Sequence, residues 1–83
     1  MQFANTVLDV NVGEPVELTL ENAGSMTHDF SLSDGVAQPV KIEAAGDQTA
    51  HGTFTIERPG TYEFVCSQPG HALAGMRGTI VAQ

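Results

Sequence analysis

Short runs in which apolar and polar residues alternate recur along the chain, whereas apolar residues nowhere repeat at the spacing of a helix face. Residues 16–21 are an example, because Val16, Leu18 and Leu20 alternate with acidic or hydroxyl side chains. A period of two puts the apolar side chains on one face of a strand and the polar ones on the other. The pattern predicts an all-β chain of about seven strands, at residues 6–12, 16–21, 28–32, 40–43, 49–56, 61–66 and 77–82.

Turn-forming residues separate these runs. Gly13–Pro15, Ser33–Gly35 and Arg58–Gly60 each contain glycine, proline or both, as tight turns often do. Strands with one apolar face, joined by such turns, favour antiparallel sheets that are solvated on one side. We therefore predict a single domain over residues 1–83 with the fold of a small Greek-key β-sandwich. Tyr62, just after the third turn, is placed in a way similar to the tyrosine corner of such sandwiches.

The length of the chain limits what can hold it together. A domain of 83 residues buries only about 60% of the surface that its unfolded chain exposes, so its hydrophobic core is small. Small domains often add a disulfide or a metal ion to that core. Cys66 is the only cysteine, which excludes a disulfide within the chain.

The charge of the chain favours some partners over others. Three Lys or Arg residues against ten Asp or Glu residues give a net charge of −7. This balance disfavours nucleic acid and anionic membranes and favours a basic partner. No apolar run is long enough for a membrane span. No basic stretch followed by an apolar block lies near Met1, so we expect no signal peptide in this chain, which is then the mature domain if the protein is exported.

Four potential metal ligands stand out. Cys66, His71 and Met76 follow one another at intervals of five residues, with a Pro-Gly pair that turns the chain back between the first two. The fourth, His28, shares the inward face of its expected strand with Phe30. Two histidines, a cysteine and a weakly bound methionine form the trigonal set with a long axial ligand that suits blue copper. Zinc prefers tetrahedral sites, usually with more Cys or His, and iron–sulfur clusters need more than one thiol.

These four residues and their flanking sequences resemble those of the cupredoxins, the blue (type 1) copper electron-transfer proteins. The likeness extends to Asn22–His28, Gly60–Cys66 and Gly75–Val81. With four residues on each side of His71 before the next ligand, the ligand loop most resembles the loops of rusticyanin and sulfocyanin. The resemblance implies one copper ion that cycles between Cu(I) and Cu(II), with the metal ligands His28, Cys66, His71 and Met76.

The resemblance also implies a function and a location. A site with no ligand position left open for a substrate favours an electron-transfer protein over an enzyme. The chain is then a monomer that shuttles single electrons between redox proteins, such as a cytochrome or a terminal oxidase with a basic docking face. The compartment implied is the periplasm or another extracytoplasmic space.

Two alternatives stay open. One is a copper-binding carrier, although carriers favour exchangeable sites rich in Met or Cys, and two of the three methionines lie outside the motif. The other is a cupredoxin domain cut from a larger copper oxidoreductase. Multicopper oxidases flank the cysteine with histidines, whereas Cys66 lies between Val65 and Ser67, and His51 is the only spare histidine. Blue colour that persists after dialysis favours electron transfer, and ready loss of copper to a chelator favours a carrier.

Residues around the ligands have further expected roles. Asp29 follows an inward-facing His28 and so points away from the interior. Its carboxylate either accepts the backbone N–H of Ser67 and ties the two ligand segments together, or is an exposed acid with no partner. By the family resemblance, the ring edge of His71 is exposed in a small apolar patch that meets redox partners. The patch residues are Met26, Leu73 and Ala74, with Val36 nearby.

Overall fold

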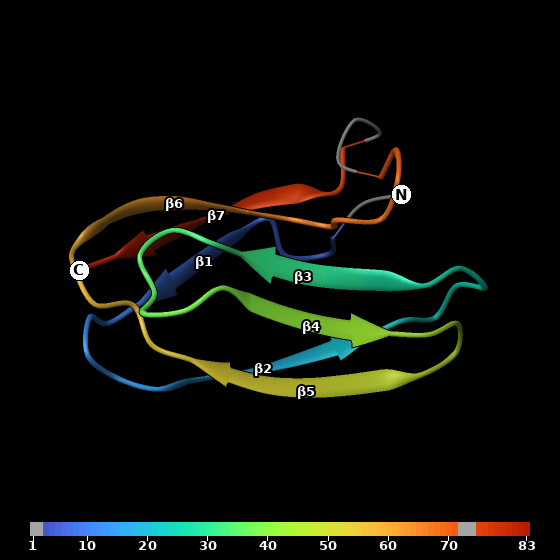
Figure 1. Ribbon diagram of the computed structural model, residues 1–83, viewed down its shortest axis with the longest axis horizontal. Coiled ribbons are helices and arrows are strands. Elements are labelled where there is room, and N and C mark those ends of the chain that lie inside the picture. The colour runs from blue at the N-terminus through green and yellow to red at the C-terminus, as the bar shows by residue number, and fades with distance from the viewer. Residues whose placement is uncertain (1–2, 72–74) are drawn as a thin grey trace.

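The computed structural model describes residues 3–71 and 75–83 (Figure 1). The regular elements in this part of the chain are the strands β1 (Val7–Val10), β2 (Val16–Glu21), β3 (His28–Leu32), β4 (Val40–Ala44), β5 (Thr49–Phe54), β6 (Gly60–Val65) and β7 (Arg77–Ala82). The expected strands at 16–21, 28–32 and 77–82 match β2, β3 and β7 residue for residue, and the others differ only at their ends. The same described residues contain no helix that is long and apolar enough to cross a membrane.

The strands form two sheets, which confirms the predicted all-β sandwich. One sheet has the strand order β1-β7-β6-β3-β4, and the other consists of β2 and β5. In Figure 1, β6 and β7 lie along the upper side of the molecule, and β2 and β5 lie along the lower side. The apolar side chains of both sheets face the space between them, as the alternation along the strands requires.

One pairing differs from the expected antiparallel arrangement. β1 runs parallel to β7, with Val7 opposite Thr79 and Val10 opposite Ala82, whereas the other paired strands are antiparallel. The prediction of antiparallel sheets is wrong at this position because the turn after β1 leads into β2, which belongs to the other sheet. The chain therefore does not fold back on β1 as a hairpin, and the last strand becomes the neighbour of the first.

An aromatic cluster fills the space between the sheets. Phe30 of β3 stacks on Phe54 of β5 with the ring centroids 5.5 Å apart, and its ring lies 4.8 Å from that of Phe64 on β6. Ile56 and Ile80 belong to the same core and are completely buried. Aromatic side chains bury more apolar area than most residues, so a short chain can build its core from a few of them.

Tyr62 fixes the end of the sandwich that carries the turn between β3 and β4. Its hydroxyl donates a hydrogen bond of 2.8 Å to the carbonyl oxygen of Arg58, four residues upstream, as in a tyrosine corner. A Cβ atom at Gly35, whose φ is +81°, would lie 2.7 Å from the Tyr62 ring, so this turn favours glycine. Val36 follows that turn and lies at the opposite end of β3 from His28. The expectation that Val36 lies near the ligands is wrong.

The other end of the sandwich, on the right in Figure 1, carries the segments that hold the candidate ligands. β3 begins here with His28, and β6 ends one residue before Cys66. Antiparallel pairing of β3 with β6, through Ser31 opposite Val65, places the start of one strand beside the end of the other. Sheet topology thus brings together two ligands that are 38 positions apart in the sequence.

Candidate metal centre

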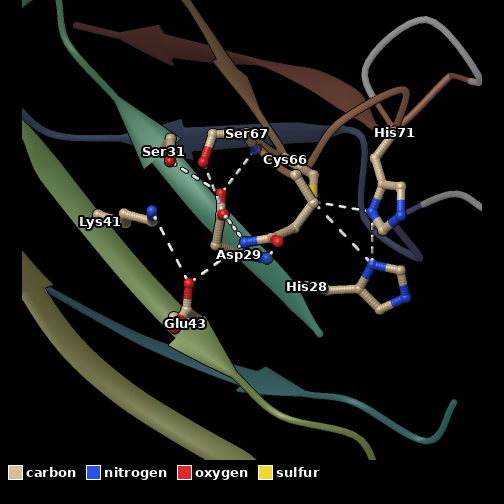
Figure 2. A network of polar contacts seen from close by, with 9 residues as sticks. His28, Asp29, Ser31, Lys41, Glu43, Cys66, Ser67 and His71 are labelled. Atoms are coloured by element: carbon tan, nitrogen blue, oxygen red, sulfur yellow. Dashed lines mark hydrogen bonds and ion pairs between the residues drawn. The ribbon is translucent and has the colours of Figure 1, made fainter. Parts of the chain in front are cut away.

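Three side chains from two distant parts of the chain meet at this end of the sandwich. Nδ1 of His28 lies 3.2 Å from Nδ1 of His71. Sγ of Cys66 lies 3.3 Å from Nδ1 of His71 and 4.0 Å from Nδ1 of His28. Figure 2 shows both rings with these nitrogens turned toward the sulfur. The structure therefore brings together three of the four predicted ligands around one point.

The spacing of these atoms suits a single metal ion. Bonds from a metal ion to imidazole nitrogen or thiolate sulfur are about 2.0–2.3 Å long, so two ligands of one ion lie at most about twice that distance apart. The three donor atoms of His28, Cys66 and His71 all lie within 4.8 Å of one another. Among the described residues, no other group of three His, Cys, Asp or Glu side chains meets this condition.

The backbone of the segment between β6 and β7 places Met76 beside the same point. The N–H of Cys66 donates a hydrogen bond to the carbonyl oxygen of Met76, and the N–H of Met76 donates one to the carbonyl oxygen of His71, each at 2.9 Å. The Met76 side chain is only 3% exposed and lines the same cavity as His28. With a thioether beside two imidazoles and a thiol, the donor set is the one that suits blue copper.

Local contacts prepare His28 and Cys66 to bind a metal ion. Burial, and next the neighbouring His71, lower the pKa of His28 below its ordinary value of 6.5, so its imidazole is neutral at pH 7 and has a free nitrogen lone pair. Cys66 is completely buried, and its sulfur accepts a hydrogen bond of 3.4 Å from the backbone N–H of Asp29. This contact fixes the position of the sulfur beside the two imidazoles.

Asp29 lies at the centre of a polar network beside the ligands (Figure 2). Its carboxylate accepts hydrogen bonds from the backbone N–H and the hydroxyl of Ser67, both at 2.7 Å. The side chains of Ser31 and Gln68 donate two more, at 2.8 and 2.9 Å. The expected hydrogen bond from Ser67 is therefore present. It connects the residue after His28 to the residue after Cys66.

Asp29 lies on the expected face of β3, which points away from the sandwich core, but it is not exposed to solvent. Asp29 is 0% exposed, because the segment after Cys66 folds over that face of β3. Burial by itself would raise the pKa of Asp29, but the hydrogen bonds from Ser67, Gln68 and Ser31 outweigh it and hold the pKa below its ordinary value. Asp29 is thus a buried carboxylate that stays ionised at neutral pH.

Two residues that organise this end were not identified from the sequence. Asn22 is buried, and its side-chain amide donates hydrogen bonds to the carbonyl oxygens of Met26, Ala44 and Ala45, while its Oδ1 accepts the N–H of Gly24. An asparagine between a strand and a glycine is a signal for such a turn. Gln68 bridges Asp29 and Glu43, and no sequence signal indicates that contact.

The predicted docking patch is described only in part. Met26 is 52% exposed, as a patch residue should be, whereas Leu73 and Ala74 lie outside the described residues. His71 is only 3% exposed as a whole residue, and the expected exposure of its ring edge stays a prediction. His28 is the more accessible of the two histidines.

Comparison with known proteins places this geometry in context. A family described as "Copper binding proteins, plastocyanin/azurin family" matches residues 1–83. The copper-resistant cuproprotein CopI of Rubrivivax gelatinosus is 26% identical over an alignment that covers 100% of this chain and 61% of that protein. The chain thus spans less than two thirds of the length of this curated relative.

Solved structures share the fold. Auracyanin A, a "blue" copper protein of Chloroflexus aurantiacus, superposes with a TM-score of 0.85 at 23% identity, over 99% of this chain and 89% of that one. A reduced amicyanin variant superposes with a TM-score of 0.67 at 28% identity, over 100% and 74% of the two chains. The two-sheet arrangement described above is therefore the cupredoxin-like sandwich that the sequence predicts.

The Asp29 network predicts a loss of order at the metal centre when the carboxylate is removed. In Asp29→Ala the donors of Ser67 and Gln68 lose their partner, and leaving such groups unsatisfied costs about 1–3 kcal/mol. We expect the free energy of unfolding to fall by this amount and the visible absorption band and reduction potential of the copper-loaded protein to shift. The exposed Asp34, at the other end of the molecule, provides the control Asp34→Ala. If neither spectrum nor potential moves in Asp29→Ala, the network does not position the ligands.

The same network predicts a dependence on acid. Because the pKa of Asp29 is lower in the folded protein than in the unfolded chain, its stabilising effect is fully present above the unfolded pKa of about 3.9. That effect is lost as the pH falls through the lower folded pKa. Asp29→Asn lacks this pH-dependent contribution to the free energy of unfolding. Urea unfolding of both metal-free proteins between pH 6 and pH 2 measures the contribution as the difference between them.

Proposed function

The chain belongs to the plastocyanin/azurin family of copper-binding proteins, and on that premise we propose that it is a mononuclear type 1 copper protein that carries single electrons between redox partners. The observation that carries the proposal is the convergence of Nδ1 of His28, Sγ of Cys66 and Nδ1 of His71 within 4.8 Å. A bound copper ion supplies the exchange of one electron between Cu(I) and Cu(II). The protein supplies the ligands, their spacing and their protection from water.

Each ligand has a distinct role in this proposal. The imidazoles of His28 and His71, the thiolate of Cys66 and the thioether of Met76 would hold the copper ion, with the thioether as the weakest donor of the four. Sulfur ligands are soft and favour Cu(I), while the imidazoles suit both oxidation states. The set is complete without a solvent molecule or substrate, which supports electron transfer rather than catalysis.

Rigid ligands support the same function. Cys66, His71 and Met76 are all at most 3% exposed, and backbone hydrogen bonds tie Cys66 to Met76 and Met76 to His71. Ligands that are fixed by the fold move little when the charge of the ion changes, so little reorganisation accompanies each electron. The structure of the site supports a carrier of electrons that does no chemistry on a substrate.

A copper carrier is the second candidate, because the relative CopI is named a copper-resistant cuproprotein. A carrier must release its ion, and three ligands that are nearly completely buried oppose rapid release. The chain also spans only 61% of that relative, so it can equally serve as the electron-transfer domain of a longer copper protein. Both readings keep the same four ligands.

The family relationship supports further, finer proposals. We propose that the loop with four residues on each side of His71 is of the rusticyanin and sulfocyanin kind; the similar structures described above are an auracyanin and an amicyanin. We also propose an extracytoplasmic location, such as the periplasm, because proteins of this family are typically found there.

We also propose where the redox partner docks. Both histidines lie at the end of the sandwich that carries the exposed Met26, and Leu73 and Ala74 belong to the same ligand segment in the sequence. His28 is partly exposed at this end, so a partner that docks here approaches one of the proposed copper ligands directly. The net charge of −7 favours a basic partner, such as a cytochrome or an oxidase, and salt screens that attraction.

Replacing the axial ligand tests the proposed function. In Met76→Gln an amide oxygen, which is harder than a thioether, stabilises Cu(II), so we expect the reduction potential to fall. Voltammetry of the copper-loaded variant measures the shift. Met26→Gln makes the same chemical change at an exposed position and should leave the potential where it is. An unchanged potential in Met76→Gln removes this residue from the site.

Copper should also stabilise the small fold. An ion that binds only the folded state, at a free concentration a thousand times its Kd, stabilises that state by about 4 kcal/mol. At about 4–8 °C per kcal/mol for a domain of this size, the Tm rises by roughly 15–30 °C. Calorimetry with and without copper measures the rise, and Cys66→Ser, which lacks the thiolate, should show little of it. Equal Tm values with and without copper would show that the core suffices alone.

Docking at this end predicts two different responses to salt. Met26→Glu and Leu73→Glu place a charge in the contact, so each should slow bimolecular electron transfer to a basic redox protein by about tenfold at any ionic strength. Replacing Glu17 and Glu21 with glutamine should slow it only at low salt, since a Debye length of about 10 Å at 0.1 M screens distant charges. Stopped-flow rates across an ionic-strength series separate the two effects. Unchanged rates in both patch variants place the docking surface elsewhere.

A further inference from the structure

β2 has a hydrogen-bonded neighbour on only one side. In the described residues it pairs with β5 alone, from Val16 opposite Phe54 to Glu21 opposite Thr49. Only every second residue of an antiparallel strand exchanges hydrogen bonds with a given neighbour. The remaining N–H and C=O groups of β2 therefore face its free edge, where they can pair with another strand.

A cavity of about 630 Å³ lies along this free edge. Its lining includes every residue from Leu18 to Gly24. Successive side chains of a strand point to opposite faces, so a cavity that touches four consecutive strand residues must follow the edge of β2 rather than one face. The lining also includes residues 3–5, Leu8, Phe30 and Phe64. The molecule thus has an apolar groove beside unpaired backbone groups.

The charges beside the groove are of one sign. Glu17 and Glu21 stand on the exposed face of β2, on either side of Thr19. The strands β2 and β5 contain no Lys or Arg. Lys41 and Arg77 lie on other strands and form ion pairs with Glu43 and Glu63. A strand that pairs with β2 therefore meets two carboxylates on one face and apolar side chains on the other.

These observations select the kind of strand that fits. A second copy of this chain is disfavoured, because antiparallel pairing of two β2 strands centred on Thr19 puts Glu17 opposite Glu21, and like charges directly opposite are destabilising. Lysine or arginine at alternate positions would instead lie across from those carboxylates, and the intervening apolar side chains would enter the groove.

We propose that the free edge of β2 binds an extended segment of a partner protein in which apolar residues alternate with lysine or arginine. Backbone hydrogen bonds to β2 supply affinity, and the groove between β2 and residues 3–5 supplies selectivity for apolar side chains. The groove also reaches His28 and Met76, so the bound segment ends beside the metal centre. This site goes beyond the proposed electron transfer and does not depend on it.

The experiment uses the reduced, copper-loaded protein with ¹⁵N labels and two synthetic probes. One is an acetylated, amidated heptapeptide of alternating lysine and valine, and the other replaces each lysine with glutamate. We expect the lysine peptide to slow hydrogen exchange at the edge-facing amides of residues 17–21 by at least about tenfold and to shift the resonances of residues 3–5. The glutamate peptide should do neither at the same concentration.

Charge reversal separates this proposal from simpler ones. Glu17→Lys with Glu21→Lys should weaken binding of the lysine peptide by at least about tenfold, whereas Glu57→Lys, an exposed change outside this groove, should have little effect. No protection of β2 at millimolar lysine peptide overturns the proposal. Equal binding of both peptides, insensitive to charge reversal, overturns it in favour of the apolar cavity alone. Protection that grows with protein concentration without peptide identifies a second copy as the occupant and also overturns it.

Discussion

The metal centre depends on a buried carboxylate. The strands that lead to the two ligand segments, β3 and β6, are paired in the sheet only through Ser31 opposite Val65. Beyond that pair, Asp29 holds them together with hydrogen bonds to both groups of Ser67 and to Gln68. A buried charge is tolerated only where hydrogen bonds replace water, and three of the four hydrogen bonds to Asp29 come from the segment that follows Cys66.

The position of this network explains how so small a protein can keep a defined site. Its apolar core, built around Phe30, Phe54 and Phe64, fills the middle of the sandwich and cannot order the loops at the end. Polar contacts take over there: Asn22 fixes the segment before His28, and Asp29 fixes the segment after Cys66. Core and site thus use different interactions at different places, and they can be changed separately.

Much of this arrangement can be predicted from the sequence, and the predictions that are wrong are wrong for physical reasons. Alternation locates strands such as β2 and β3 well, because side-chain period is a local property. Alternation also assigns Asp29 to the correct face of β3, but it does not tell what covers that face, so the burial of Asp29 under residues 67–68 was missed. The buried position of His71 and the parallel pairing of β1 with β7 depend on contacts between distant segments in the same way. The placement of Val36 was avoidable, since a strand of five residues separates its turn from His28.

The hydrogen bonds between β6 and β7 give the ligand segment a particular independence. Val65 pairs with Arg77, and the N–H of Cys66 donates to the carbonyl oxygen of Met76. The pairing of β6 with β7 therefore extends up to the first and last ligands of this segment. Cys66, His71 and Met76 therefore all belong to the connection between β6 and β7, whereas His28 belongs to β3. A change in the length or sequence of that loop alters three ligands at once and leaves the two sheets intact. Evolution can accordingly change the properties of the metal centre by replacing this loop as a unit, while His28 keeps its position in β3.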